Sequence, residues 1–434
     1  MHKLVFAAAI AAFPAAAPAQ QAPLRDAVAR DYRDNLGALF DHFHRNPELS
    51  GRETQTAARM ARELRALGYE VTTGVGGTGV VALLRNGAGP TVMMRADMDG
   101  LPLQERSGLP NASTARQVGA DGTEQPVMHA CGHDVHITAL VGAARQMIAR
   151  RGNWSGTLML IAQPAEETIS GARAMIQDGL YTRFPKPDYA IAFHVDADRP
   201  AGRISVPETI AYSSSDIVTM RVNGVGTHGA SPHQGVDPVL VAAQIIVSLQ
   251  SIVSREINPL DGRVITVGAI HGGVRGNIIP EHVDLALTVR ADNAAVRTQL
   301  LDGIDRVARG TALALGVPED RLPVVTRSTI ETTPPTINHA PTARLVREAI
   351  AAAMGADRLI ELPREGMGAE DFAYFVTPES GVRGVYFGVG GTPPEQVASA
   401  PGHHSPLFRI SPEPAVTAGV EGMVVAAEAL FRRR

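Results

Sequence analysis

The chain lacks most of the features that would assign it at once to a class of protein. Its 434 residues include one cysteine, aromatic residues make up 4% of the chain, and the formal net charge is −4. A single cysteine excludes an intrachain disulfide framework. The small net charge gives no reason to expect a nucleic-acid partner or an acidic membrane surface. Beyond the N-terminal leader we expect no apolar stretch of ~18 residues, and therefore no membrane anchor.

The first 19 residues have the pattern of a secretory signal peptide. A short basic start, Met1–Lys3, precedes an apolar stretch, and Ala17-Pro18-Ala19 fits a small-residue cleavage site. We therefore expect Gln20 to begin the mature chain and the protein to be exported to a bacterial periplasm. A free thiol in such an oxidising compartment is a liability unless it is buried or metal-bound, which favours a ligand role for Cys131.

Hydrophobic periodicity predicts an α/β fold. The spacing of apolar residues from Ala22 to Leu67 is helical, with a polar break at Arg45–Ser50, and His42 and His44 are expected at the surface or at a helix end. Buried strands and apolar helices then follow: strands at 70–73, 79–85, 91–95, 157–162 and 189–193, and helices at 137–148 and 171–177. This order is typical of a sheet with helices on both faces.

The order of elements changes near Ser213. Strands and helices now follow the β-α-β-β-α-β order of the ferredoxin-like motif: strands 216–222, 264–270, 282–290 and 322–327, and helices 238–252 and 294–315. Helices 343–354 and 414–431 and a strand at 384–389 complete the chain. We predict a mixed-sheet α/β catalytic domain over 20–212 and 332–434, interrupted by an inserted ferredoxin-like α+β domain over 213–331, with the signal peptide over 1–19.

The segment Met128–His136, MHACGHDVH, places the only cysteine among three histidines and an aspartate. Zinc and similar ions take thiolate, imidazole and carboxylate ligands, and the Cys-Gly-His spacing lets one loop present Cys131 and His133 to the same ion. The apolar helix that follows would put Cys131 near a helix N-terminus, where the dipole lowers a thiol pKa. The alternative is a buried, inert cysteine; its ligand-type neighbours favour the metal.

Acidic residues and a histidine follow three predicted strands, at the strand ends where ligands bind in open α/β sheets. They are Asp97 and Asp99, the pair Glu166–Glu167, and His194. One carboxylate of the pair can bind a metal while the other takes a proton from water and passes it to a leaving group. Alternatively, the pair is the solvated start of a helix.

Five side chains are candidate metal ligands: Cys131, His133, Glu167, His194 and one of His403 and His404. A structural zinc ion takes four ligands, so five suit two ions when one ligand bridges them. A thiolate can form that bridge, and two-metal sites are suited to hydrolysis.

Eight segments resemble, in order, the motifs of the co-catalytic metallopeptidase family that includes aminoacylase and carboxypeptidase-G-type enzymes. They cover nearly the whole mature chain: RADMDGLP (95–102), MHACGHDVH (128–136), QPAEE (163–167), FHVD (193–196), GTHGASPH (226–233), GGVRGNIIP (272–280), GAEDF (368–372) and HHSP (403–406). The chain is most similar to the branch with hippurate hydrolase, indole-acetyl-amino-acid hydrolases and N-acetyl-diaminopimelate deacetylase.

The resemblance implies a role for each candidate residue. Cys131 would bridge two divalent ions, Zn²⁺ or Mn²⁺ with Co²⁺ or Ni²⁺ as further options, and Glu166 would be the general acid/base. Asp99 would be the supporting aspartate, with Asp97 sharing that role. The remaining ligands would be His133, Glu167, His194 and His404, and the inserted domain would supply His228, which polarises the oxyanion in the neighbouring subunit's site, and Asn277, which contacts substrate.

Two positions depart from the pattern of this branch. His403-His404-Ser405-Pro406 stands where relatives commonly have Leu-His-Ser-Pro, and we choose His404 as the ligand because it precedes Ser-Pro. Arg275 stands where relatives often have a small or apolar residue. It either binds a substrate carboxylate or is a solvated loop charge.

These observations predict a secreted, metal-dependent amidohydrolase that releases the free amino acid and the carboxylic acid from an N-acyl amino acid such as hippurate. The inserted domain is expected to act as a lid and to form a homodimer or a higher homo-oligomer. A dipeptidase or exopeptidase of the same fold is the alternative enzyme. A non-catalytic periplasmic metal- or peptide-binding protein is the alternative of another class, and Glu166 beside Glu167 argues against it, because binding alone needs no base.

Overall fold

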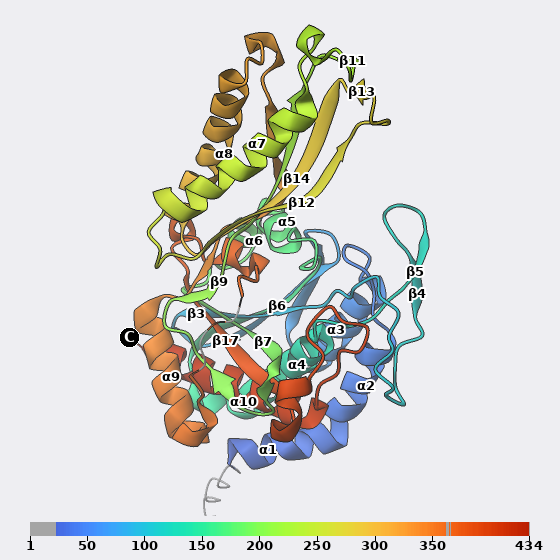
Figure 1. Cartoon of the computed structure of the whole chain (residues 1–434). Helices are drawn as coiled ribbons and strands as arrows, with labels where there is room; N and C mark the ends of the chain where they lie inside the picture. Colours follow the sequence, from blue (N-terminus) through green and yellow to red (C-terminus); the bar gives the residue numbers. More distant parts are fainter. Residues whose placement is uncertain (1–22, 362–363, 365, 434) are drawn as a thin grey trace, which may run out of the picture.

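The computed structural model describes residues 23–361, 364 and 366–433, so the predicted signal peptide lies outside the described residues. A seven-stranded mixed sheet, ordered β1-β2-β6-β3-β7-β17-β8, forms the centre of the larger part of the chain (Figure 1). Strands β6, β3, β7 and β17 run parallel, and the outer pairs are antiparallel. The strand bounds are Glu70–Val75 (β1), Gly79–Asn86 (β2), Thr91–Asp97 (β3), Gly156–Gln163 (β6), Tyr189–Pro200 (β7), Ile204–Ser205 (β8) and Arg383–Thr392 (β17).

Helices cover both faces of this sheet, which confirms the predicted fold class. Alternate residues of β6 enter two cores: Leu158 and Leu160 pack with α4 and α10, whereas Met159 and Ile161 pack with α5 and α6. A strand buried on both faces is apolar throughout, which explains the missing polar alternation in its sequence. The helices are α1 (Leu24–Asp31), α2 (Gly37–Arg45), α3 (Thr54–Ala66), α4 (His133–Ala149), α5 (Gly171–Gln177), α6 (Leu180–Arg183), α9 (Ala340–Met354) and α10 (Pro412–Arg432).

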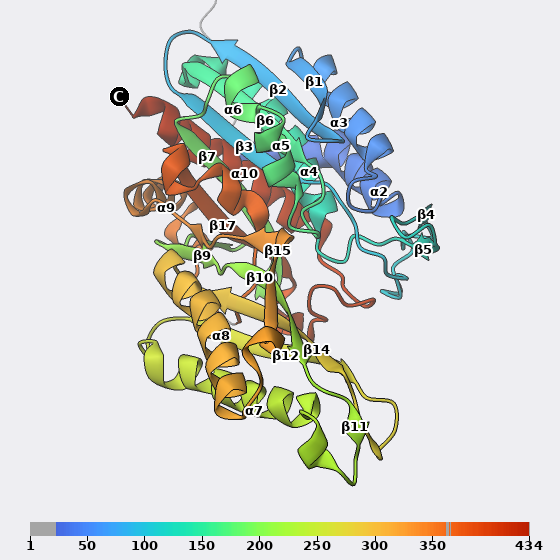
Figure 2. The ribbon, with the colours of Figure 1, turned by 90° about the horizontal axis from the view of Figure 1, so that it is seen from above.

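A second, four-stranded antiparallel sheet, ordered β12-β14-β10-β15, carries α7 and α8 on one face (Figures 1 and 2). Together with the β-α-β-β-α-β chain order, this strand order is the ferredoxin-like arrangement, as predicted. The roles of this part as a lid and as a dimerisation surface stay predictions. The bounds are Ser215–Asn223 (β10), Pro238–Ser251 (α7), Arg263–Gly272 (β12), His282–Ala291 (β14), Ala294–Ala314 (α8) and Val324–Thr333 (β15).

Among residues 23–433 that the structure describes, two helices are long and apolar enough, by length and composition alone, to cross a membrane. They are α10 and the continuous helix Pro238–Glu256, which joins α7 to a π-helical turn. The expectation that no such stretch follows the leader is therefore wrong. In α10, 83% of the apolar window is buried, so it is a core helix that packs on the seven-stranded sheet. The other helix packs against α8 and β14, with 33% of its window buried.

Candidate metal centre and active site

The predicted metal-binding side chains meet where the parallel strands end. Strand β3 ends at Asp97 beside Gln163, the last residue of β6, while α4 begins at His133 and His194 lies within β7. The carboxyl ends of neighbouring parallel strands open at one edge of a sheet, so the loops that follow them lie together. The site is therefore assembled from segments that are far apart in the sequence.

Cys131 is common to two groups of potential ligand atoms. In one group, Cys131, His133 and His194 each place a ligand atom within 4.8 Å of the others; in the second, Cys131 does so with Glu167 and His404. Cys131 Sγ lies 3.4 Å from His194 Nε2, and His404 Nε2 lies 3.2 Å from Glu167 Oε2. The structure thus brings together all five side chains that were predicted as ligands.

Unpartnered buried atoms in this cluster fit a cation. His133 Nδ1 donates to the backbone oxygen of Asp99 at 2.9 Å, which leaves Nε2 as the free ring nitrogen. That Nε2 and Glu167 Oε1 are both buried without a hydrogen-bond partner in the described part of the chain, and they lie 3.9 Å apart. Buried polar atoms are normally satisfied, so two that face each other are explained by an ion between them.

The two adjacent histidines of the C-terminal loop face different ways. His403 Nε2 accepts the backbone N–H of Ala197 at 3.2 Å, and its ring packs against Phe408. His404 has φ of 60° and points its Nε2 at Glu167. This geometry favours His404 as the ligand, because the Nε2 of His403 is already engaged by a backbone amide.

The thiol of Cys131 lies in surroundings that oppose its ionisation. Burial, together with the nearby charges of Glu167 and Glu166, raises the pKa of Cys131 well above its ordinary value. The expectation that the following helix lowers this pKa is therefore wrong, although α4 does begin two residues later. Desolvation and carboxylate repulsion outweigh a helix dipole that is worth ~1 kcal/mol. A bound cation would favour the thiolate form of this side chain.

Glu166 and Glu167 lie in a turn with unusual backbone geometry. Ala165 has φ of 51° and Ile169 has φ of 54°; with His404 they are the non-glycine residues of positive φ in the described part of the chain. Such residues are disfavoured and gather at functional sites. Burial, then Glu370 and Glu167, raise the pKa of Glu166 well above its ordinary value.

A buried arginine organises carboxylates behind the site. Arg95 donates to Asp97 Oδ2 at 2.7 Å and to Glu370 Oε1 at 2.6 Å, and it pairs with Asp371 at 3.2 Å. Tyr386 Oη donates to Glu370 Oε2 at 2.7 Å. No role for Arg95 or Glu370 was derived from the sequence, although both lie in the family-like segments RADMDGLP and GAEDF, which were the available signal. Asp97 does lie behind the ligands, where a supporting role was predicted.

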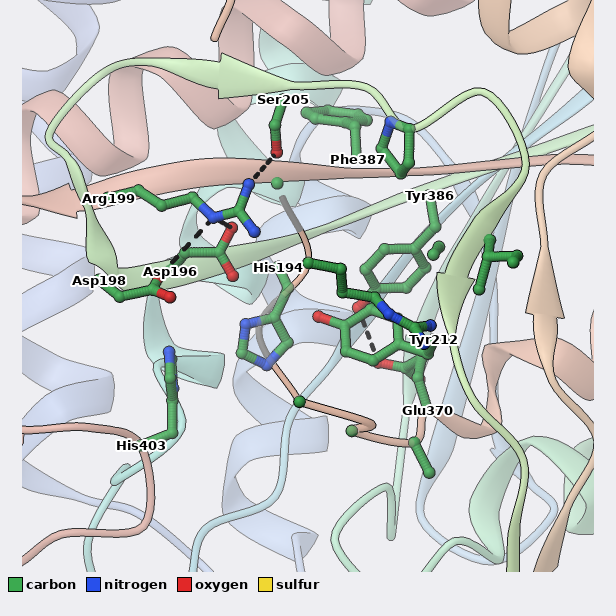
Figure 3. A pocket seen from close by; sticks show the side chains of 18 of the residues that line it. His194, Asp196, Asp198, Arg199, Ser205, Tyr212, Glu370, Tyr386, Phe387 and His403 are labelled. Carbon is green, nitrogen blue, oxygen red and sulfur yellow. Dashed lines mark hydrogen bonds and ion pairs between the residues drawn. The ribbon is translucent and has the colours of Figure 1, made fainter. Parts of the chain in front are cut away.

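A cavity of about 770 Å³ opens beside the cluster (Figure 3). Its wall includes Glu166 and four of the five candidate ligands, so these side chains face one space, while His133 is not among the lining residues. The four ligands are Cys131, Glu167, His194 and His404. Arginines also line it, and three have acidic partners: Arg199 pairs with Asp196, Arg347 with Glu361 and Arg364 with Asp292.

Arg290 differs from these three arginines. It lies in β14 and lines the same cavity, but it forms no ion pair with any described residue. Its Nη1 donates to Thr288 Oγ1 at 2.7 Å and to the backbone oxygen of Val289. Burial lowers the pKa of this guanidinium, since its charge is incompletely compensated. Sequence reasoning did not single out Arg290, because a lone arginine in a strand carries no local signal.

Three predicted residues are not brought to this site by the fold. His228 lies in β11 (Thr227–His228), Asn277 precedes β13 (Ile278–Ile279), and Arg275 lies in the same loop. All three are exposed and absent from the cavity wall, and Figure 1 places β11 and β13 at the far end of the small sheet. Their predicted roles stay predictions.

His44 lies next to the end of α2, as expected, but its side chain is buried and paired. Its Nδ1 lies 2.7 Å from Asp134 Oδ2, and its Nε2 makes a longer ion pair of 3.3 Å with Glu105 Oε1. Of the two positions expected for His44, the surface or a helix end, the structure shows the helix end. His44 ties α2 to the first turn of α4, directly behind His133.

Comparison with known proteins identifies the family of this chain. Residues 93–428 match the sequence model of peptidase family M20/M25/M40. The hippurate hydrolase of Campylobacter jejuni is 38% identical over 288 residues, which cover 65% of this chain and 71% of that protein. The IAA-amino acid hydrolase ILR1-like 2 of Arabidopsis thaliana is 33% identical over 374 residues, covering 85% and 79%.

Two proteins of Bacillus subtilis are also similar. The N-acetyl-L-cysteine deacetylase is 34% identical over 340 residues, which cover 77% of this chain and 76% of that protein. The crystal structure of a dinuclear metal-binding peptidase of the M20 family superposes with a TM-score of 0.76 at 27% identity, covering 93% of this chain and 99% of that one. The chain therefore belongs to peptidase family M20/M25/M40 and is a metal-dependent hydrolase.

Proposed function

We propose that the protein hydrolyses the amide bond of N-acyl amino acids, releasing a carboxylic acid and a free amino acid. The observation that carries this proposal is one cavity lined both by Glu166, next to the ligand cluster, and by the unpaired Arg290. The first can assist amide hydrolysis and the second can bind the carboxylate of an amino acid. The similar hippurate hydrolase, IAA-amino acid hydrolase and N-acetyl-L-cysteine deacetylase carry names of this substrate class.

The side chains divide the chemistry between them. Cys131, His133, Glu167, His194 and His404 would hold two divalent ions with Cys131 as the bridge, Zn²⁺ or Mn²⁺ in the first place and Co²⁺ or Ni²⁺ as alternatives. Bound ions would polarise the amide carbonyl and lower the pKa of water. Glu166 takes the proton of the attacking water and returns it to the nitrogen of the leaving amino acid. Its carboxylate makes no hydrogen bond to any described residue, so it is available to accept and return this proton.

A substrate panel on the metal-loaded enzyme tests this proposal. Hippurate and N-acetyl amino acids should be hydrolysed, and replacing the substrate carboxylate by a carboxamide should lower kcat/KM by roughly 10–100-fold, the worth of a charge-assisted hydrogen bond. Preferred turnover of dipeptides with a free amino group would instead establish the exopeptidase alternative. Binding of two ions without turnover of any amide would establish the non-catalytic alternative.

We propose further that the enzyme is a homodimer in which His228 serves the site of the other subunit. Its position outside this chain's own cavity supports this, as do exposed apolar side chains of the small domain: Leu240, Val247, Ile270 and Ile278. Mixing inactive Glu166→Gln and His228→Ala subunits should restore at most about one quarter of wild-type activity, since half of the dimers are mixed and each holds one complete site. A mixture that stays inactive would contradict the arrangement.

Export to a bacterial periplasm is also proposed, on the strength of residues 1–19. Expression of the full chain with cell fractionation tests it. The mature protein should be found in the periplasmic fraction with Gln20 as its first residue. An uncleaved chain in the cytoplasm would contradict the proposal.

A further inference from the structure

Glu53 is a buried carboxylate that links three separate segments beside the candidate site. Its Oε1 accepts the backbone N–H groups of Gly51 and Ala165 at 2.7 Å and 2.8 Å, and its Oε2 accepts the hydroxyl of Thr78. The side chain is 0% exposed. The sequence analysis assigned no role to Glu53, which follows the polar break at Arg45–Ser50, and the proposed function leaves it without one.

The bond to Ala165 matters because of where this residue stands. Ala165 immediately precedes Glu166 and has φ of 51°, a left-handed conformation that a side chain with Cβ disfavours. Its carbonyl is already fixed by the N–H groups of Ser170 and Gly171. Glu53 is the partner of its N–H, so the Glu53 carboxylate completes the bonding that keeps this residue in its strained conformation.

The other side of Glu166 is held in the same way. Asp99 Oδ2 accepts the backbone N–H of Glu167 at 2.9 Å and the hydroxyl of Ser50 at 2.6 Å. Two carboxylates from different loops therefore anchor the amides on either side of Glu166. The Glu166 carboxylate has no hydrogen bond to any described residue, and the backbone oxygen of Glu166 accepts the N–H of Ile169 at 2.6 Å within the same turn. The position of the carboxylate therefore depends on how this turn is anchored.

A simpler role for Glu53, capping its own helix, does not fit the contacts. Glu53 occupies the N-cap position of α3 but its side chain bonds no amide of that helix. The first turn of α3 is served instead by Glu48, whose carboxylate accepts the N–H groups of Gln55 and Thr56 at 3.2 Å and 2.7 Å. The Glu53 carboxylate is directed across to Ala165.

We propose that Glu53 is a positioning residue for Glu166: by accepting the N–H of Ala165 it fixes the turn that presents the Glu166 carboxylate to the substrate. This inference rests on the proposed function, in which Glu166 is the general acid/base. The role requires a hydrogen-bond acceptor on a side chain of the right length, and it does not require a negative charge. Glutamine meets that need, since its carbonyl oxygen can accept from Gly51 and Ala165 while its amide donates to Thr78.

Steady-state kinetics of four variants on the full metal-loaded chain, with hippurate as substrate, test the proposal. Glu53→Ala should lower kcat by about 100-fold with KM little changed, because small displacements of a catalytic group cost that much. Glu53→Gln should keep kcat within about threefold of wild type, since it preserves the bonds. Glu53→Asp keeps the charge but withdraws the carboxylate by one methylene. Its kcat should fall as much as that of the alanine variant. It therefore replaces the alanine variant in the test if that variant does not fold.

Glu48→Ala is the matched control. It removes a buried carboxylate from the same loop and the bonds at the start of α3, so it should lower the unfolding temperature yet leave kcat near wild type. Metal content after loading should be unchanged in all four variants, because Asp99 still holds Glu167. Equal kcat in Glu53→Ala and Glu48→Ala, or a Glu53→Gln as impaired as Glu53→Ala, would overturn the proposal.

Glu166→Gln, assayed beside these variants, separates the two levels of inference. If it keeps near-normal activity, the proposed function fails and the role of Glu53 fails with it. If Glu166→Gln is inactive while Glu53→Ala and Glu53→Asp keep normal kcat, only the role of Glu53 fails.

Discussion

His136 Nδ1 lies 2.6 Å from Asp97 Oδ1, and the opposite ring nitrogen, Nε2, accepts the backbone N–H of Val195 at 2.9 Å. Since Nε2 is an acceptor, the ring proton resides on Nδ1 and is donated to Asp97. One neutral imidazole therefore connects the end of β3 with the residue that follows His194. This bridge links Asp97 to the residue next to His194, a candidate metal ligand.

Replacing this bridge should weaken both stability and metal binding. We expect His136→Phe to lower the free energy of unfolding by about 1–3 kcal/mol, because it leaves the Val195 amide and an Asp97 oxygen buried without their partner. The affinity for at least one ion should fall by roughly 10–100-fold, as for other residues that orient ligands. Urea unfolding and competition with a chelator measure the two effects. His282→Phe, at an exposed position of β14, is the control and should change neither.

Substitution of Glu166 should separate chemistry from metal binding. We expect Glu166→Ala to retain its metal content and fold but to lose kcat by at least about 10²–10⁴-fold, the usual contribution of a general acid/base. The five proposed ligands are untouched by this change. Elemental analysis and hippurate kinetics on the same sample check it. An active variant would remove Glu166 from the mechanism.

Arg290 should matter for the turnover of substrates that carry a carboxylate and not for those that lack one. Arg290→Met is expected to lower kcat/KM for hippurate by roughly 10–100-fold and to leave the slower hydrolysis of its carboxamide almost unchanged. Arg347→Met is the matched control, since Arg347 lines the same cavity but is paired with Glu361. Equal losses on the acid and the carboxamide would show that Arg290 acts on the fold and not on the substrate.

His44 should give stability that is lost at alkaline pH. Burial alone would lower its pKa, but the hydrogen bond with Asp134, the ion pair with Glu105 and the charges of these carboxylates raise it to about 10. A pKa raised above the ordinary 6.5 means that this stabilisation is complete below pH 6.5 and is lost as the pH rises towards about 10. Urea unfolding should show that the difference in the free energy of unfolding between wild type and His44→Gln becomes smaller over that pH range. A constant difference would contradict a charged His44.

Most of the fold follows from periodicity because its strands are long and buried. The stretches 157–162 and 189–193 were predicted and became β6 and β7, and helix 171–177 became α5 with the same bounds. Strands of two or three residues, such as β8 and β9 (Ile210–Tyr212), were not predicted. Such short segments are too short to show a hydrophobic periodicity. They form through pairing with β17 and with β16 (Thr336–Ile337), which local sequence does not reveal.

Site residues could be predicted where several reactive side chains stand close together in the sequence. They could not be predicted where the role depends on a contact with a residue far away in the sequence. Cys131 and the Glu166–Glu167 pair stand in ligand-rich segments at strand ends. The role of Arg95 depends on its contact with Glu370, which is 275 positions away in the sequence. The role of Glu53 depends on its contact with Ala165, which is 112 positions away. The thiol pKa of Cys131 was predicted in the wrong direction for a related reason, since burial in the folded chain and carboxylates from another loop raise it.

The central claim is that Cys131 bridges two ions, and metal stoichiometry of Cys131→Ser tests it most directly. Cys131 belongs to both ligand groups, so the serine variant should retain at most one ion per subunit by elemental analysis, whereas wild type holds two. His403→Gln is the control and should hold two, because the Nε2 of His403 is occupied by the Ala197 amide. Two ions per subunit in Cys131→Ser, bound as tightly as in wild type, would contradict the account.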